Sequence, residues 1–205
     1  MPTTTRHATH RPIAARAHAT SSASGTLALA TLGLAAALAF VPAFGARAAG
    51  HTTGEMTADL INAEGETIGS ATLTQTASGE VLVRAEASGL EPGVHGFHIH
   101  ETGVCDPATG FESAGGHYVG EGDPKHGLVE GGPHAGDMAN QTVAADGTLV
   151  AEAFNPRVTL DGDTNPLADA DGSALMIHSG ADDYESQPGG DAGSRVACAV
   201  IAAPQ

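Results

Sequence analysis

Histidines are the residues with which this chain is best equipped to do chemistry. His98 and His100 stand two apart in the string GFHIH, so on a strand both imidazoles would project from the same face. Two imidazoles on one face can bind one metal ion, since neutral imidazole is the commonest side-chain metal ligand. Such a pair also occurs without a metal, so further ligands must accompany it.

A second set of candidate ligands follows in the chain. His134 and Asp137 are three apart in the string HAGD, where a tight turn would form a reasonable half-site for tetrahedral zinc. His117 and His126 lie in the same glycine-rich stretch. His178 ends the apolar segment ALMIH, where a buried neutral histidine is the alternative. Six such histidines in one short domain favour metal binding over packing or solubility.

Short segments of alternating apolar and polar residues must position these ligands. The string EVLVRAEAS (80–88) has the period of a half-buried strand, and the pairs SG (78–79) and DG (146–147) are typical of hairpin turns. Similar strands are predicted at 56–62, 67–76, 94–100, 139–145, 148–154, 173–178 and 195–202. Eight short strands without a convincing helical segment predict an all-β barrel or sandwich.

Two polar intervals, 101–137 and 179–194, are too long to be ordinary turns. Long loops inside a compact domain are usually functional. Most of the candidate ligands lie in these intervals or at their edges.

The chain is strongly acidic, and its charge is unevenly distributed. Its 24 acidic and 8 basic residues give a net charge of −16 over 205 residues. Binding to a phosphate backbone depends on Lys and Arg, so no nucleic-acid partner is expected. Residues 1–48 contain four arginines and no acidic residue, which indicates a segment with a separate use.

That first segment has the pattern of a secretory signal peptide. Three arginines precede an apolar run at 27–44, which ends at the small-x-small string ARA (46–48). We expect a signal peptide over 1–48 and a mature domain over 49–205. An uncleaved membrane anchor is the alternative, since the run reaches the lower limit of a span, but Pro42 favours cleavage. We expect export, to the periplasm if the source is Gram-negative and otherwise to the medium or cell surface, with no stable membrane partner after cleavage.

Export has two further consequences. Cleavage after residue 48 would leave Ala49, Gly50 and His51 at the new amino terminus. A free amine, two amides and an imidazole can form a square-planar site for Cu(II) or Ni(II), and an ordinary tail is the alternative. An oxidising compartment also predicts that Cys105 and Cys198 are paired rather than free.

Five strings of the sequence resemble the copper/zinc superoxide dismutase family, in its exported bacterial type. They are GVHGFHIHETGVC (93–105), SAGGHY (113–118), HAGDMAN (134–140), IHSGADD (177–183) and GSRVACAVI (193–201). They occur in the family's order and cover about residues 55–203. The resemblance implies an eight-stranded Greek-key β-barrel or sandwich with two long functional loops, in agreement with the predicted strands.

The resemblance also assigns ligands for one copper and one zinc per subunit. It implies copper ligation by His98, His100, His117 and His178, and zinc ligation by His117, His126, His134 and Asp137. His117 would bridge the two ions.

Other residues match the family's supporting positions. Asp182 matches a carboxylate that hydrogen-bonds one ligand of each metal, and Arg195 matches an arginine beside the copper. Cys105 and Cys198 match the family's disulfide, and His95 matches a structural histidine.

The implied activity is the conversion of superoxide to O₂ and hydrogen peroxide by Cu(II)/Cu(I) cycling, with Arg195 and His117 as catalytic residues. It would serve antioxidant defence outside the cytoplasm. The loop 179–194 contains no lysine, so Lys125 is the nearest candidate for attracting the substrate, with an ordinary solvated charge as the alternative. The sequence is compatible with a monomer and with a homodimer.

Two other functions are alternatives. A non-catalytic metal-binding or copper-handling protein could have the same fold, but it would be expected to lack a copper ligand or the arginine. A zinc hydrolase would need an open zinc site with three protein ligands and a free carboxylate base.

Overall fold

The computed structural model describes residues 54–202 and residue 205. The predicted signal peptide (1–48) and the possible metal site at 49–51 lie outside these residues. Within the described part, no helix has the length and apolar character needed to cross a membrane.

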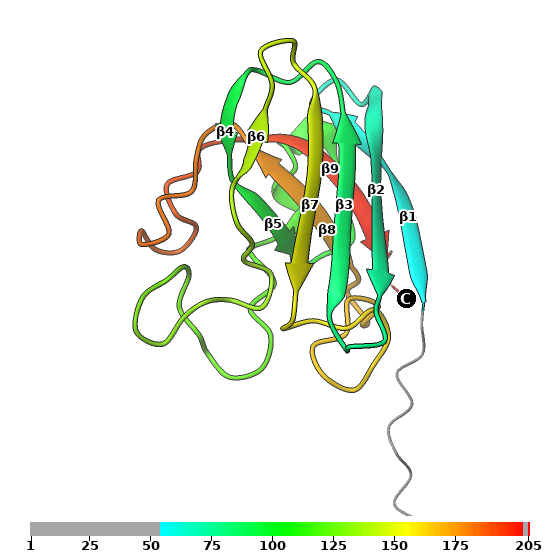
Figure 1. Ribbon diagram of the computed structural model, residues 1–205, viewed down its shortest axis with the longest axis vertical. Coiled ribbons are helices and arrows are strands. Elements are labelled where there is room, and N and C mark those ends of the chain that lie inside the picture. Colours follow the sequence, from blue (N-terminus) through cyan, green and yellow to red (C-terminus); the bar gives the residue numbers. More distant parts are fainter. Residues whose placement is uncertain (1–53, 203–204) are drawn as a thin grey trace, which may run out of the picture. The chain divides into compact units, whose positions relative to one another are not determined.

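The described domain is built from nine antiparallel strands in one sheet (Figure 1). The strands are β1 (Glu55–Asn62), β2 (Thr67–Gln75), β3 (Val81–Ala87), β4 (Gly93–His95), β5 (Phe97–His100), β6 (Gln141–Val143), β7 (Leu149–Asn155), β8 (Ser173–His178) and β9 (Arg195–Ala202). Their spatial order is β4-β6-β7-β3-β2-β1-β9-β8-β5. Between residues 54 and 202 the only helical pieces are two 3₁₀ turns, η1 (Pro107–Thr109) and η2 (Glu112–Ala114).

The predicted all-β Greek-key barrel is confirmed. Strand β3 lies beside β7 rather than β4, so β4, β6, β7 and β3 are neighbours in that order, which is the Greek-key arrangement. Figure 1 shows β8 and β9 passing behind β7 and β3, so the sheet curves back on itself.

The structure has one strand more than the sequence predicts, because the predicted strand 94–100 is two strands divided at Gly96. Strand β4 pairs with β6, whereas β5 pairs with β8, at the opposite end of the strand order. The chain therefore crosses from one edge of the sheet to the other at this glycine, and we call this place the seam. A Cβ at Gly96 would lie 2.9 Å from the Ala192 Cβ, so the crossing leaves no room for a larger residue.

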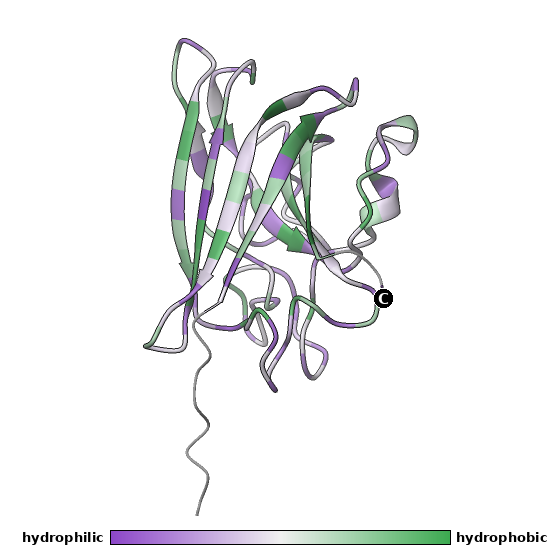
Figure 2. Ribbon diagram, turned by 90° about the vertical axis from the view of Figure 1, so that its right-hand side faces the viewer, coloured by the Kyte–Doolittle hydropathy of each residue, from purple (hydrophilic) through white to green (hydrophobic). Residues whose placement is uncertain are grey.

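Apolar and polar residues alternate along several strands (Figure 2), and on β5 this alternation separates the core from the candidate ligands. On β5, Phe97 and Ile99 are fully buried in the main hydrophobic cluster, together with Ile177 of β8. His98 and His100 project from the opposite face, as the sequence predicts, and are nevertheless buried because loops cover that face.

Two long loops provide this cover, and the structure confirms both predicted intervals. The first long loop, residues 101–140, joins β5 to β6, and the second long loop, residues 179–194, joins β8 to β9. A disulfide between Cys105 and Cys198 fastens the first long loop to β9, as predicted. Phe111 and Met176 are buried in a small cluster around this bond.

Candidate metal centre

The candidate ligands gather into two groups that share one residue. The four-histidine group consists of His98, His100, His117 and His178, and the aspartate-containing group consists of His117, His126, His134 and Asp137. Within each group the possible ligand atoms all lie within 4.8 Å of one another, and every member is buried. The structure thus brings together all seven residues that the resemblance implies as copper and zinc ligands.

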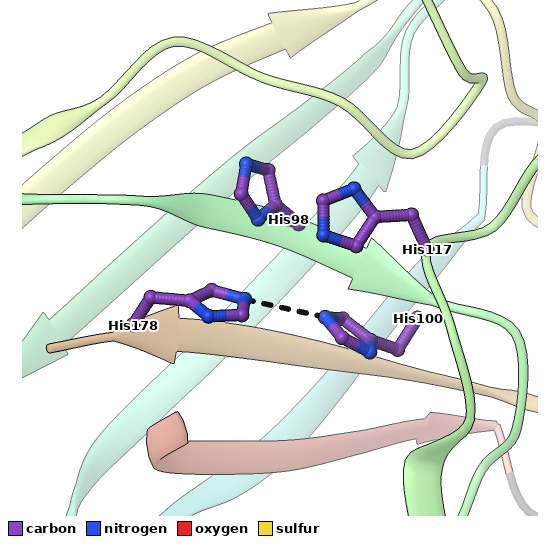
Figure 3. A group of neighbouring side chains, drawn as sticks. All are labelled: His98, His100, His117 and His178. Carbon is purple, nitrogen blue, oxygen red and sulfur yellow. Dashed lines mark hydrogen bonds between the residues drawn. The ribbon is translucent and has the colours of Figure 1, made fainter. Parts of the chain in front are cut away.

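Strand β5 organises both groups. It supplies His98 and His100 directly, and β8, its hydrogen-bonded neighbour, ends at His178 (Figure 3). The first long loop runs along the other side of β5. Ile99 donates its N–H to the Gly136 carbonyl (2.9 Å) and accepts the N–H of Tyr118 (2.8 Å). These two bonds place the neighbouring residues of the loop, His117 and Asp137, against the strand.

In the four-histidine group, two unprotonated nitrogens face each other. The Nδ1 of His100 lies 3.0 Å from the Gly115 carbonyl, and the Nδ1 of His178 lies 3.4 Å from the Gly193 carbonyl. A carbonyl oxygen only accepts, so the protons belong on these nitrogens and leave both Nε2 atoms bare. The two Nε2 atoms are 3.4 Å apart. Burial lowers the pKa of His100 to about 2 and that of His178 to about 3, so neither ring gains a second proton near neutrality.

The aspartate-containing group converges on one carboxylate oxygen. Asp137 Oδ1 lies 2.9, 3.1 and 3.5 Å from the Nδ1 atoms of His117, His126 and His134, respectively. Its other oxygen, Oδ2, accepts the N–H groups of Gly127 and His134, which fixes the orientation of the carboxylate. Burial alone would raise the pKa of Asp137, but the hydrogen bonds from His117 and Gly127 outweigh burial and lower it.

Asp182 connects the two groups. Its Oδ2 accepts a hydrogen bond from His98 Nε2 at 2.7 Å, and its Oδ1 accepts one from His126 Nε2 at 3.0 Å. Each imidazole therefore carries its proton on Nε2 and turns a bare Nδ1 towards its group. This arrangement is the one that the family resemblance implies for Asp182.

The unsatisfied atoms of the site show that metal ions fit it. Among the described residues, the buried side-chain nitrogens and oxygens without a hydrogen-bond partner are the Nδ1 atoms of His98, His126 and His134. Each such atom costs about 1–3 kcal/mol when it stays unpaired in the protein interior. All three belong to the two groups, and a cation is the partner that bare nitrogens and a carboxylate share. Four imidazoles suit Cu(II), and three imidazoles with one carboxylate suit a closed zinc site.

A cavity of about 650 Å³ gives solvent access to the site. His100, His117 and His178 of the four-histidine group line it, and so does His134 of the aspartate-containing group. Arg195 also lines it and is held in place, because its guanidinium donates to the carbonyls of Phe111 and Gly115.

Two other candidates from the sequence lie apart from the groups. His95 belongs to neither, and its ring nitrogens lie 2.6 and 2.8 Å from the carbonyl oxygens of His178 and Glu91, in keeping with a structural role. Lys125 is exposed and is not among the residues that line the cavity.

The structure adds residues that spacing in the sequence does not indicate. Gln187 accepts the His126 N–H and donates to the His126 carbonyl, so one side-chain amide pairs with both sides of a ligand's backbone. Asn140 pairs in the same way with Asp182, and Arg157 contacts the backbone of His134. These contacts join residues far apart in the sequence, and no local pattern predicts them.

Known proteins resemble the chain in both sequence and structure. A family model described as copper/zinc superoxide dismutase (SODC) matches residues 67–201. Cu-Zn superoxide dismutase 2 of Aquifex aeolicus is 52% identical over 147 residues, 70% of this chain and 84% of that protein. Cu-Zn superoxide dismutase of Escherichia coli K12 is 38% identical over 174 residues, 81% of this chain and 96% of that protein.

Solved structures give the same result. A double mutant of a superoxide dismutase-like protein from Bacillus subtilis superposes with a TM-score of 0.67 at 37% identity, covering 71% of this chain and 96% of that one. The Cu/Zn superoxide dismutase of Brucella abortus superposes with a TM-score of 0.58 at 27% identity, covering 72% of this chain and 99% of that one.

Proposed function

Because the chain belongs to the copper/zinc superoxide dismutase family, we propose that it converts superoxide to O₂ and hydrogen peroxide at a copper and zinc centre. The four-histidine group would hold copper, and the aspartate-containing group would hold zinc, one ion of each per subunit. When bound, copper supplies the reversible one-electron change that dismutation needs, and zinc supplies a positive charge that does not change oxidation state.

The observation that carries this proposal is the sharing of His117 by two buried groups of ligand atoms. One imidazole with a nitrogen for each ion can hold two metals at a fixed separation. Its Nδ1 lies 2.9 Å from Asp137 Oδ1, on the side of the aspartate-containing group. We infer that His117 would hold both ions, and that its other ring nitrogen, Nε2, could hold a proton for the product.

Arg195 is the second residue for which we propose a catalytic role. It lines the cavity beside His100 and His178, and its positive charge contributes to the low pKa of both imidazoles. A guanidinium has five N–H donors, so two bonds to carbonyls leave others for an anion. Arg195 would attract superoxide and orient it in the cavity.

The same residues argue against the two alternatives. A non-catalytic metal-binding protein on this fold would be expected to lack a copper ligand or the arginine. This chain has four histidines that lie close together, and it has Arg195, which lines the cavity. A zinc hydrolase needs an open zinc site, whereas the aspartate-containing group offers a complete set of four buried donors.

We further propose that residues 1–48 are a signal peptide and that the enzyme acts in antioxidant defence outside the cytoplasm. The Cys105–Cys198 disulfide supports this proposal, because such bonds persist in oxidising compartments.

The test is superoxide consumption by the copper- and zinc-loaded protein, compared with a His98→Ala variant. We expect the variant to lose both copper and activity. Arg84→Gln is the control, because Arg84 is a half-exposed residue of β3 paired with Glu152, and it should keep both. Full activity in a His98→Ala protein that has lost its copper would rule out the proposed centre.

A further inference from the structure

Arg157 lies just beyond the end of β7 and contacts the turn that carries two of the proposed zinc ligands. Its Nε donates to the carbonyl of His134 at 3.2 Å, and its Nη2 donates to the carbonyl of Asp137. One guanidinium therefore binds both ends of the four-residue turn HAGD.

The neighbouring Asn155, the last residue of β7, extends this contact. Its side-chain amide is fully buried and donates to the carbonyl of Ala135 at 2.8 Å. Its Oδ1 accepts the backbone N–H of Arg157 at 2.9 Å, and Asn165 donates to the Arg157 carbonyl at 2.8 Å. Hydrogen bonds thus hold both the N–H and the carbonyl of the Arg157 backbone, so its guanidinium contacts the turn from a fixed position.

The turn needs such support because it belongs to no strand. It lies within the first long loop, and its ligand atoms must converge on one point. Asp137 Oδ1 and His134 Nδ1 lie only 3.5 Å apart without a hydrogen bond between them. These two atoms must keep this separation to share one cation, and Arg157 contacts the backbone carbonyls of the same two residues.

We propose that Arg157 is a positioning residue for zinc, which holds the backbone of His134 and Asp137 so that their ligand atoms stay converged. This inference rests on the proposed function, because it takes the aspartate-containing group as the zinc site. The planar fork of arginine suits two carbonyl oxygens at once, whereas the compact ammonium of lysine keeps the charge without the fork.

The test measures zinc retention by the copper- and zinc-loaded protein in the presence of a chromogenic chelator. Residues that orient metal ligands typically change metal affinity by about 10- to 100-fold when they are replaced. We expect Arg157→Met to weaken zinc binding at least about tenfold. Arg157→Lys should fall between Arg157→Met and wild type. Arg84→Met, the control on β3, should match wild type.

Two readouts separate positioning from general stabilisation. Co(II) placed in the zinc site should show a changed visible spectrum in Arg157→Met and an unchanged one in Arg84→Met. Zinc should also raise the Tm of Arg157→Met by less than it raises that of wild type, since the stabilisation by a ligand increases with the logarithm of its affinity. Wild-type zinc retention with a wild-type Co(II) spectrum in Arg157→Met overturns the inference. If Arg157→Met does not fold, the same result in Arg157→Lys overturns it.

These outcomes are independent of the proposed activity. If wild type consumes superoxide and the Arg157 variants keep zinc normally, only the inference fails. If wild type does not consume superoxide but the variants lose zinc, the proposed function fails and the role of Arg157 stands.

Discussion

Asp182 Oδ2 lies 2.7 Å from His98 Nε2, and both side chains are shielded from solvent. Since the other oxygen of Asp182 accepts from His126, one carboxylate sets the orientation of one ligand in each group. Asp182 is itself oriented by the N–H of Tyr184 and by the amide of Asn140, so this control extends into both long loops.

Asp182→Asn should therefore weaken the binding of both metals. The side chain of Asn has only one accepting oxygen, which could accept from His98 or from His126 but not hold both. Its NH₂ group would face the N–H of the other imidazole. We expect about a tenfold or greater loss of copper and zinc affinity, measured by chelator competition. Glu185→Gln is the matched control, since it removes an exposed charge from the same loop. Loss of one metal with normal retention of the other would contradict the linking role of Asp182.

Gly190→Ala should disrupt the same link by a steric route. A Cβ at Gly190 would lie 1.9 Å from Asp182 Oδ1 and 2.6 Å from His126 Nε2, and the residue has a φ of +70°. Gly110→Ala is the control, because Gly110 has a φ of +62° with nothing within 4 Å of an added Cβ. The control should lose about 1–2 kcal/mol from backbone strain alone. Urea unfolding should show a larger loss for Gly190→Ala, accompanied by weaker zinc binding. Equal losses in the two variants would count against the steric argument.

The metal-free protein should become less stable as the pH falls from about 6.5 to about 3. In the unfolded chain His100 and His178 titrate near 6.5, whereas burial lowers their pKa in the folded protein to about 2 and about 3. Between these values the unfolded state binds more protons. The free energy of unfolding therefore decreases as the pH is lowered, by up to about 1.4 kcal/mol per pH unit for each imidazole.

Asp137 and Asp182 act in the same direction at lower pH. Both have a lowered pKa in the folded protein, so their contribution is present above the ordinary value of 3.8 and is lost below it. Urea midpoints of the chelator-treated protein, measured across this range, provide the check. A midpoint that rises on acidification would mean that these groups are not buried as neutral imidazoles and charged carboxylates.

The charges around the cavity should control the rate at which superoxide reacts. Arg195 is positive, and burial lowers its pKa. The negative charge of Glu112 acts in the opposite direction on that pKa, and Glu112 also lines the cavity. We expect Arg195→Gln to reduce the rate about tenfold at low salt and Glu112→Gln to increase it. The wild-type rate should fall as salt rises, because salt screens the attraction of Arg195 and the metals. A wild-type rate that rises with salt would mean that the acidic surface dominates.

Much of the fold follows from local patterns in the sequence. All eight predicted strands exist, because alternation of apolar and polar residues reflects the burial of one face, as in Val81, Val83 and Ala85 of β3. The division at Gly96 is less evident in that pattern. The apolar positions change phase at this glycine, since Val94 stands at an even position and Phe97 and Ile99 at odd ones. That break does not show that the pairing partner changes from β6 to β8.

The candidate site divides in the same way. The spacing of His98 and His100 predicts their common face because strand geometry is local. Asp182 has no such signal, and only resemblance to known proteins indicates it. The sequence predicts no role for Arg157 or Gln187, because they contact backbone atoms of residues far away in the chain. Such contacts depend on loop conformation, which spacing does not encode.

The seam at Gly96 makes the four-histidine group depend on closure of the barrel. His98 and His100 follow directly after the crossing, whereas His178 stands on the strand to which β5 joins only when the two edges of the sheet meet. In an open sheet these imidazoles belong to separate pieces of chain, so the four-histidine group is incomplete. The four members of the aspartate-containing group, by contrast, all lie in the first long loop. The four-histidine group therefore exists only in the closed barrel, whereas the aspartate-containing group depends on the conformation of a single loop.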